Sequence, residues 1–296
     1  MGPLQSDLGE ERCLEIITRA AELGVNFFDT AEGYKTQPYL GKYLKNKRSG
    51  IVVATKSHAK TDDEMAVSVE KSLLELQTDY IDIYHLHSVR DCPKVFEERK
   101  GALRKLNQLK QEQIIKAVGL ATHNVKVVNA AAERDDVDIL FVLINKAGMG
   151  IVDGTTAEMV EAIEKAAHAG KGLYVMKALA GGNLLPDYHE ALSWARRLEG
   201  ISSVAVGVVS IKELLQNLKH FGLKTPETEN VSPDITIKEK KLHILERLCT
   251  GCATCVEACP NNALFLEGEK AKINHENCIL CGYCSPHCPL FLIRMV

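Results

Sequence analysis

The sequence predicts an α/β protein in which a parallel sheet covered by helices is followed by a small cysteine-rich domain. Two observations predict this arrangement. Over about residues 1–222, short apolar runs alternate with amphipathic helical stretches, which is typical of a parallel sheet with helices on its faces. Near the C-terminus, one cysteine pattern occurs twice at a fixed offset, and a fixed offset marks an internal repeat.

The apolar runs define the sheet, and the periodic stretches between them define the helices. We expect seven strands, at about 25–31, 51–56, 81–87, 116–123, 139–145, 172–179 and 202–210. We expect helices at about 8–24, 62–77, 94–112, 125–133, 156–169, 186–199 and 211–222. A doubly wound sheet and a (β/α)₈ barrel both fit these elements. The G-x-G-x-x-G turn of a Rossmann first strand is absent.

The composition changes after Gly222. Residues 224–240 are polar, contain two prolines and have no hydrophobic period, which indicates a linker or an extended wrap. This boundary separates a first domain at 1–223 from a second at 241–296. Between the two cysteine blocks, the sequence reads as a hairpin that turns at Gly268.

Composition excludes several classes of function. A net charge of −3 gives no basis for binding nucleic acid or an anionic membrane surface. No window of about eighteen apolar residues exists, so we expect no transmembrane helix, and the N-terminus lacks the pattern of a signal peptide. Of ten cysteines, only Cys13 and Cys92 lie outside the repeat, and both read as plain thiols. A reducing cytoplasm fits this usage.

The duplicated pattern is C-x₂-C-x₂-C-x₃-C-P, read as CTGCATCVEACP at 249–260 and as CILCGYCSPHCP at 278–289. Equivalent cysteines are 29 positions apart. This spacing holds [4Fe–4S] clusters in bacterial ferredoxins: three thiolates wrap one cluster, and the fourth cysteine reaches the other. The predicted ligand sets are Cys249, Cys252, Cys255 and Cys288 for one cluster, and Cys278, Cys281, Cys284 and Cys259 for the second.

Zinc and disulfides are the alternatives for these cysteines. Zinc ribbons use C-x₂-C pairs and leave no role for a third cysteine or for the Cys-Pro step. The spacing therefore favours iron–sulfur clusters. The segment at about 241–296 resembles a two-cluster bacterial ferredoxin domain.

Ionisable residues gather at the predicted ends of the first three strands, where parallel barrels collect their chemistry. These residues are Asp29, Tyr34, Lys56 and His87. A lysine beside a tyrosine favours the phenolate and lowers the tyrosine pKa, and a carboxylate keeps the lysine charged and oriented. With a histidine that bonds a carbonyl oxygen, the set can donate a proton to a carbonyl that accepts hydride. Each residue alone has a plainer interpretation, such as a turn cap or a core histidine.

Taken together, these residues resemble the aldo-keto reductase family over about residues 1–222. The matching segments are DTAEGY at 29–34, ATKSH with Lys56, DIYHLH with His87, FVLIN with Asn145, MKALAGGNL at 176–184 and GVVSIKELLQNL at 207–218. The resemblance implies a (β/α)₈ barrel. With the cysteine array, the whole chain is similar to the ferredoxin-fused branch of that family.

The resemblance also implies a mechanism, in which NADP(H) or NAD(H) exchanges hydride with a small carbonyl or alcohol substrate. Tyr34 would be the general acid, Lys56 and Asp29 its tuning pair, and His87 the residue that orients the carbonyl. The cofactor-binding candidates are Asn145, Gly181, Gly182, Ser210 and Asn217. Lys212 lies where a basic residue favours NADP, but Glu213 stands where an arginine often sits, so NADP is only slightly preferred.

The chain departs from the family at its N-terminus. The family begins with a hairpin and a first barrel strand, and this chain has no counterpart of either. Seven strands do not close an eight-stranded barrel without exposing two edges. We therefore expect about twenty to thirty residues of the family's barrel to be missing, which would affect the cofactor site.

A second hypothesis makes the chain an iron–sulfur electron carrier or redox sensor whose barrel binds without turnover. Nicotinamide transfers two electrons at once, whereas each cluster passes one, and no segment resembles a flavin site. The clusters could therefore serve a redox partner protein or only stabilise a small domain.

Overall fold

The computed structural model describes residues 1–2, 5, 8–45, 47–89, 91–232, 240–259, 261–278, 282 and 284–296. Seven parallel strands form one sheet in the order of the sequence, from β1 to β7. They are β1 (Phe27–Asp29), β2 (Val52–Ser57), β3 (Ile81–Ser88), β4 (Ile115–Thr122), β5 (Ile139–Leu143), β6 (Gly172–Met176) and β7 (Ser203–Ala205). A doubly wound sheet would reverse its order at a switch point, so the sequential order identifies a near-complete barrel and confirms the seven predicted strands.

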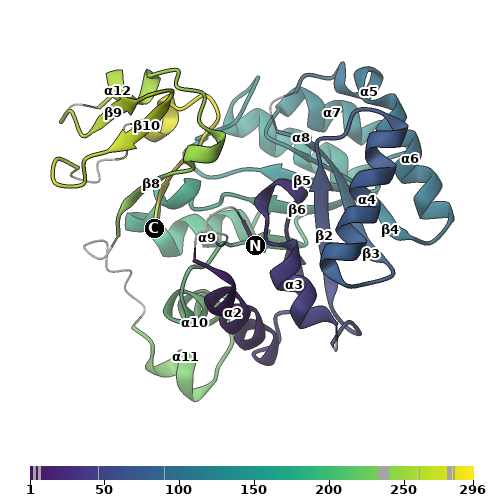
Figure 1. Ribbon diagram of the computed structural model, residues 1–296, viewed down its shortest axis with the longest axis horizontal. Coiled ribbons are helices and arrows are strands. Elements are labelled where there is room, and N and C mark those ends of the chain that lie inside the picture. Colours follow the sequence, from purple (N-terminus) through teal and green to yellow (C-terminus); the bar gives the residue numbers. More distant parts are fainter. Residues whose placement is uncertain are drawn as a thin grey trace.

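The helices cover the outside of this sheet (Figure 1). They are α2 (Glu10–Glu22), α3 (Gln37–Leu44), α4 (Asp62–Leu76), α5 (Val95–Glu98), α6 (Lys100–Gln111), α7 (Val125–Ala132), α8 (Thr156–His168), α9 (Tyr188–Arg196) and α10 (Ile211–His220). Side-chain caps fix several starts: Thr61 and Thr155 each form a capping box at α4 and α8, which satisfies the first free N–H groups of each helix. The largest apolar cluster lies between these helices and the sheet.

The two edge strands of the barrel are short because each has a ladder on one side only. β1 and β7 span three residues each, and they do not pair with each other in the described part of the chain. N-terminal residues lie near both edges. The Met1 amino group donates to the Asp29 carbonyl at 2.7 Å, and Gln5 Nε2 donates to the Val208 carbonyl at 2.6 Å.

The predicted linker contains structure that the sequence did not predict. Helix α11 (Pro226–Asn230) begins at a Thr225 capping box and contacts α10. An ion pair between Arg19 and Glu227 joins this helix to α2. The part of the linker at 233–239 lies outside the described residues.

The cysteine-rich domain is built from two small antiparallel ladders and two short helices. β8 (Leu242–Ile244) pairs with β11 (Ile293–Met295), and β9 (Leu264–Glu267) pairs with β10 (Lys270–Ile273). Gly268, with φ of +59°, lies in the two-residue turn of the β9–β10 hairpin, as predicted. Helices α12 (Thr254–Glu257) and α13 (Cys284–His287) each carry the third cysteine of a repeat.

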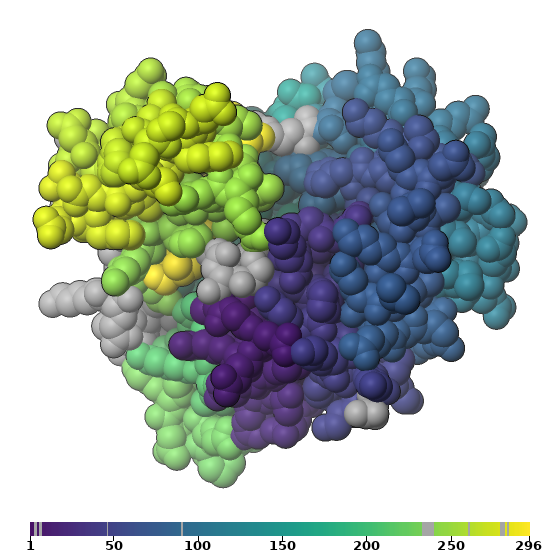
Figure 2. All heavy atoms as spheres, viewed as in Figure 1, coloured from purple at the N-terminus to yellow at the C-terminus, as the bar shows by residue number. Residues whose placement is uncertain are grey.

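This second domain packs beside the barrel and sends its last strand back onto it (Figures 1 and 2). β11 contacts η2 (Ala180–Gly182), the turn that follows β6. Asn183 Nδ2 donates to Ser285 Oγ at 2.9 Å. Phe291, which is 1% exposed, clusters with Leu143 and Ala180 at the ends of β5 and β6. Among the described residues, no helix is both long and apolar enough to cross a membrane.

Candidate active site and metal centre

Three neighbouring strands bring the four predicted catalytic residues to one end of the barrel. Asp29 is the last residue of β1, and Tyr34 ends the turn η1 (Glu32–Tyr34) that follows it. Lys56 and His87 are the penultimate residues of β2 and β3. Because adjacent parallel strands end at the same edge, the side chains gather without any long loop.

Asp29 and Lys56 form a buried ion pair. Lys56 Nζ lies 2.5 Å from Asp29 Oδ1 and 2.6 Å from the Thr30 carbonyl oxygen, and Lys56 is 1% exposed. Burial lowers the pKa of Lys56, and the Asp29 carboxylate opposes that shift. The Lys56 ammonium group is therefore held in one position by the Asp29 carboxylate and the Thr30 carbonyl oxygen.

Tyr34 is half-buried and points its ring toward both cationic and aromatic neighbours. Its ring centre lies 5.2 Å from Lys56 Nζ and 6.0 Å from the His87 ring centre. None of the described residues hydrogen-bonds to its hydroxyl. The hydroxyl is thus available to a ligand.

The expectation that Lys56 lowers the pKa of Tyr34 is wrong in this structure. Burial raises the pKa of Tyr34, the Asp29 carboxylate raises it further, and the Arg294 guanidinium opposes the rise. The reason is geometric, since Lys56 directs its ammonium group at Asp29 and Thr30. Tyr34 consequently holds its proton throughout the neutral range.

His87 is a buried, neutral imidazole beside Tyr34. It is 9% exposed and stacks on His58 with ring centres 4.2 Å apart. Burial lowers the pKa of His87 well below its usual value, and the positive charges that His58 and Lys56 can carry lower it further. A neutral imidazole has one N–H donor, so His87 can donate one hydrogen bond to a ligand.

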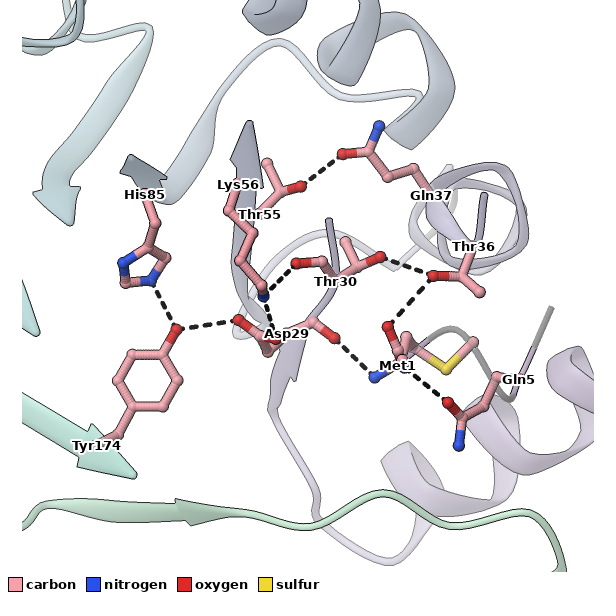
Figure 3. Close-up of polar contacts among 11 residues, drawn as sticks. Met1, Gln5, Asp29, Thr30, Thr36, Gln37, Thr55, Lys56, His85 and Tyr174 are labelled. Carbon is pink, nitrogen blue, oxygen red and sulfur yellow. Dashed lines mark hydrogen bonds and ion pairs between the residues drawn. The ribbon is translucent and has the colours of Figure 1, made fainter. Parts of the chain in front are cut away.

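A hydrogen-bonded chain beneath Asp29 was missed by sequence reasoning (Figure 3). Tyr174 of β6 donates from Oη to Asp29 Oδ2 at 3.0 Å, and His85 Nε2 lies 2.6 Å from the same Oη. The hydroxyl has one proton, which goes to the carboxylate, so His85 Nε2 carries the hydrogen it donates to Tyr174. One signal was present: a tyrosine inside the otherwise apolar strand GLYVM.

Arg99 is a second missed residue, and it fixes the strand ends that carry Lys56 and His87. Its guanidinium donates to the carbonyls of Ala59, His87 and Ser57 at 3.0, 2.9 and 3.1 Å. Arg99 is 5% exposed. A planar fork with five donors suits this role, and nothing in the local sequence around the residue indicates it.

Three of the predicted cofactor-binding residues are engaged within the barrel. Asn145 bonds the backbone of Met149 through both ends of its amide, at 2.9 and 3.0 Å. Asn217 accepts from the Tyr188 hydroxyl at 2.8 Å. Ser210 caps α10 by accepting from the Glu213 N–H. The structure thus gives these residues local partners at the positions where the sequence predicted cofactor contacts.

The remaining two cofactor candidates lie against the last strand of the second domain. A Cβ added to Gly182 would lie 2.2 Å from the Met295 carbonyl oxygen, and one added to Gly181 would lie 3.0 Å from Arg294 Cδ. Both glycines have positive φ, +67° at Gly181 and +98° at Gly182. The glycine turn is therefore closed by backbone at Gly182 and faces a guanidinium at Gly181.

The cysteines of the first predicted cluster lie near one another. The Cys255 thiol has its pKa raised to about 11, by burial first and then by Cys288, Cys249 and Cys252. These are the three partners that the crossed pattern predicts. Buried thiolates that repel one another need a cationic centre to ionise together, so this donor set fits an iron–sulfur cluster.

The second set behaves in the same way as far as it is described. Burial raises the pKa of Cys284 to about 12, and Cys259, then Cys255 of the first set, then Cys278 contribute to the rise. Cys281 lies outside the described residues. The nine described cysteines form no disulfide. Within the described ranges, no three His, Cys, Asp or Glu side chains form a group arranged to hold a metal ion.

Backbone N–H groups point at three of the cluster sulfurs. Ala271 N–H donates to Cys249 Sγ at 3.4 Å, Ala263 N–H to Cys259 at 3.2 Å, and Leu292 N–H to Cys288 at 3.3 Å. Such bonds stabilise thiolates and tune the potential of a bound cluster. Cys13 is buried and Cys92 exposed, and both are free.

Comparison with known families assigns both parts of the chain. The family model described as "Aldo/keto reductase family" matches residues 5–190. The model described as "4Fe-4S dicluster domain" matches residues 248–291. The second match covers both cysteine repeats, at 249–260 and 278–289.

Individual relatives agree with the first match. The uncharacterized oxidoreductase YqkF of Bacillus subtilis is 28% identical over 46% of this chain and 48% of its own length. L-galactose dehydrogenase of Arabidopsis thaliana is 25% identical over 74% of this chain and 80% of its own. The chain thus spans about half the length of YqkF.

Solved structures share the fold. PA4992 of Pseudomonas aeruginosa, described as an aldo-keto reductase, is 26% identical, with a TM-score of 0.62 over 71% of this chain and 80% of its own. An aldo-keto reductase of Klebsiella pneumoniae in complex with NADPH is 18% identical, with a TM-score of 0.58 over 77% and 87%. At that identity the second likeness concerns the fold alone.

Proposed function

Because the chain belongs to the aldo/keto reductase family, we propose that its barrel is an oxidoreductase that interconverts a small carbonyl and an alcohol with a nicotinamide cofactor. The attached 4Fe-4S dicluster domain makes it an iron–sulfur member of the family. One observation carries the proposal: Tyr34, whose hydroxyl has no described protein partner, has its ring 6.0 Å from that of the buried His87 and 5.2 Å from Lys56, which is paired with Asp29.

Tyr34 and His87 would act on the carbonyl oxygen. The raised pKa of Tyr34 keeps its proton in place, so this residue is the general acid that donates a proton as negative charge develops on oxygen. His87, neutral because burial lowers its pKa, would donate its N–H to the same oxygen and orient it. Neither residue needs to change its protonation state before substrate binds.

Lys56 would act on Tyr34 after proton donation, and Asp29 would hold the lysine in place. The Lys56 ammonium, 5.2 Å from the Tyr34 ring centre, would attract a phenolate more strongly than a phenol. Asp29 holds the ammonium in position at 2.5 Å. Within the pair, Lys56 would attract the phenolate, whereas the Asp29 carboxylate opposes it, since it raises the pKa of Tyr34.

The nicotinamide, when bound, supplies or accepts the hydride at the carbonyl carbon. Asn145, Gly181, Gly182, Ser210 and Asn217 stay our candidates for holding it, and we propose NADP over NAD. Gly181 faces the cation Arg294. The fold that binds NADPH in the Klebsiella protein supports this assignment.

We propose two [4Fe–4S] clusters, held by Cys249, Cys252, Cys255 and Cys288, and by Cys278, Cys281, Cys284 and Cys259. The proximity of Cys255 to its three predicted partners supports the crossed arrangement. A bound cluster supplies one electron at a time, so the domain would serve a redox partner protein. We place the protein in the cytoplasm because free cysteines persist where thiols are kept reduced.

A second function is favoured by one observation. The backbone of β11 closes the Gly182 side of the glycine turn, where the family resemblance implies a contact with the cofactor. In that case the chain would be an electron carrier or redox sensor whose barrel binds a ligand without turnover. The oxidoreductase must bind a nicotinamide cofactor, whereas the electron carrier or redox sensor need not.

The test uses the full chain, purified without air and reconstituted with iron and sulfide. NADPH should quench the fluorescence of the single tryptophan, Trp194, and carbonyl substrates should be reduced. Tyr34→Phe should abolish reduction while NADPH binding and iron content stay unchanged. Tyr39→Phe, on α3 outside the site, is the matched control. Cluster reduction by a ferredoxin-type donor without any NADPH binding would instead establish the carrier.

A further inference from the structure

The last strand of the iron–sulfur domain brings a cation to the mouth of the barrel. Arg294 lies in the middle of β11. Its Cδ and Nη1 lie 3.0 and 3.1 Å from the position of a Cβ on Gly181, and its charge interacts with Tyr34. The guanidinium therefore lies against the glycine turn, close enough to Tyr34 for its charge to act on the hydroxyl.

The position of Arg294 is fixed by its surroundings. β11 is paired with β8, and Met295 packs against Gly182. The Arg294 Cζ lies 5.1 Å from the ring centre of Phe291, which is buried between Leu143 and Ala180. The side chain is thus held by a strand and a ring, as a preformed binding group is.

The guanidinium has no carboxylate partner in the part of the chain that the structure describes. Its one hydrogen bond goes to the neighbouring Ile293 carbonyl at 3.0 Å. Burial lowers the pKa of Arg294 to about 10, and negative charge on Tyr34 or Cys288 would oppose this. A thiolate at Cys288 would compensate part of this charge, but the guanidinium fork itself has no hydrogen-bonded anion among the described residues, and a half-buried charge without one is costly. An anion would satisfy it.

We propose that Arg294 binds an anionic oxygen group of the ligand that lies between Tyr34 and Gly181. This inference rests on the proposed function. The anionic group is then either a carboxylate on the carbonyl substrate or the diphosphate of the nicotinamide cofactor. Both present paired oxygens that match the planar fork of a guanidinium. The second domain thereby contributes a binding residue to the active site of the first.

The experiment measures anion binding before turnover. Titration calorimetry on the anaerobic, cluster-loaded full chain uses inorganic diphosphate and acetate as probes. Arg294→Gln should weaken at least one of them by roughly 10- to 100-fold, since a hydrogen-bonded ion pair contributes about 1.5–3 kcal/mol. Arg294→Lys should lie between, because it keeps the charge and loses the fork. Lys241→Gln removes an exposed cation next to β8 and should change neither.

Two further measurements separate the sources of the anion. In the first, the wild type and Arg294→Gln are compared with a 2-oxo acid and with its methyl ester as substrates. If the substitution raises KM for the acid and leaves KM for the ester unchanged, Arg294 binds the substrate carboxylate. In the second, NADPH affinity is measured. If Arg294→Gln binds NADPH more weakly and its preference between acid and ester is that of the wild type, Arg294 binds the cofactor diphosphate. Iron content confirms that each variant keeps its clusters, and Arg294→Lys replaces Arg294→Gln if the latter loses them.

Two results overturn the proposal. One is a wild-type protein that binds neither probe, and the other is an Arg294→Gln variant that binds both as the wild type does. Failure of the proposed function is a different result: no NADPH binding and no carbonyl reduction by the wild type. Arg294-dependent binding of acetate or diphosphate in that protein would leave the anion site established.

Discussion

Tyr174 donates a hydrogen bond to Asp29 across the interior of the barrel, with 3.0 Å between Oη and Oδ2. The two residues are 145 positions apart in the sequence, on β6 and β1. Lys56 occupies the other carboxylate oxygen at 2.5 Å, so Asp29 is held from both sides. The orientation of the proposed lysine thus depends on a tyrosine outside the four residues that the family resemblance names.

Tyr174→Phe should destabilise the protein by about 2 kcal/mol. The change removes the hydrogen bond to a carboxylate and leaves Asp29 Oδ2 and His85 Nε2 without their partner, and bonds to charged groups are worth about 1.5–3 kcal/mol. The volume of the ring is kept, so no cavity term is added. Anaerobic urea unfolding of the cluster-loaded chain measures the effect.

Tyr84→Phe is the matched control for that change. Tyr84 is also fully buried, on β3, and its hydroxyl lies 3.2 Å from the Ser72 hydroxyl. Its bond joins two neutral groups, so its loss should cost about 1 kcal/mol. Equal effects of the two substitutions would mean that the Tyr174–Asp29 bond contributes no more than an ordinary neutral hydrogen bond.

Acid should destabilise the fold because two histidines are buried in the neutral form. Burial lowers the pKa of His85 and of His87 well below the usual value. Below about pH 6.5 the unfolded chain binds protons at these residues before the folded chain does. The stability they contribute is therefore complete above that pH and is lost as pH falls toward the folded pKa, by up to about 1.4 kcal/mol per pH unit for each histidine.

Unfolding free energy measured between pH 5 and pH 7, with iron content checked at each pH, tests this. His87→Gln should make the slope shallower by the share of one histidine. His275→Gln, at an exposed position on the second domain, should leave the slope unchanged. A slope that His87→Gln does not alter would show that His87 already takes up its proton in the folded protein.

Substituting the cluster cysteines should reveal the crossed ligand pattern. Cys255→Ser and Cys288→Ser should each remove the same cluster, although the two residues belong to different repeats, because Cys288 is a neighbour of Cys255 in space. Iron should fall from about eight to about four atoms per chain in each variant, and also in the double variant. Iron analysis and electron paramagnetic resonance measure this.

The control is Cys92→Ser, an exposed thiol outside the repeats, which should keep all the iron. If the double variant Cys255→Ser, Cys288→Ser lost both clusters while each single variant lost one, the two residues would serve different clusters. Zinc in place of iron in the anaerobic wild type would overturn the cluster assignment altogether.

Much of the fold could be read from the sequence because periodicity and spacing are local. The seven strands were expected from apolar runs, although β1 and β7 are shorter than predicted because edge strands have one ladder. The hairpin at Gly268 followed from its turn residues. Helix α11 was missed because its five residues, PETEN, are one proline and four polar residues without an apolar period, and a Thr225 capping box begins it.

The site was only partly predictable, since its remaining groups come from distant parts of the chain. Strand-end positions placed Asp29 and Tyr34, but the role of Lys56 toward Tyr34 was misjudged because the direction of the ammonium group is a packing outcome. Tyr174 and Arg294 reach the site from β6 and β11. The barrel ladder places β6, and the packing of β11 on the turn η2 places Arg294, and no local pattern encodes either.

Gly182→Ala should loosen the contact between the two domains. An added Cβ would lie 2.2 Å from the Met295 carbonyl oxygen and 2.9 Å from Met295 Cβ, closer than atoms can approach, so β11 would have to move. The substitution also carries the cost of a positive φ, here +98°, which is about 1 kcal/mol for alanine. A further 1–3 kcal/mol, roughly, is expected from the overlap.

Gly222→Ala separates these two costs. Its φ is +96°, close to that of Gly182, and an added Cβ there has no atom within 4 Å. Both variants should therefore share the conformational cost, and only Gly182→Ala should make β11 accessible to protease and weaken anion binding at Arg294. If the two variants were equally stable and equally resistant to protease, the Gly182–Met295 contact would not hold the domains together in solution.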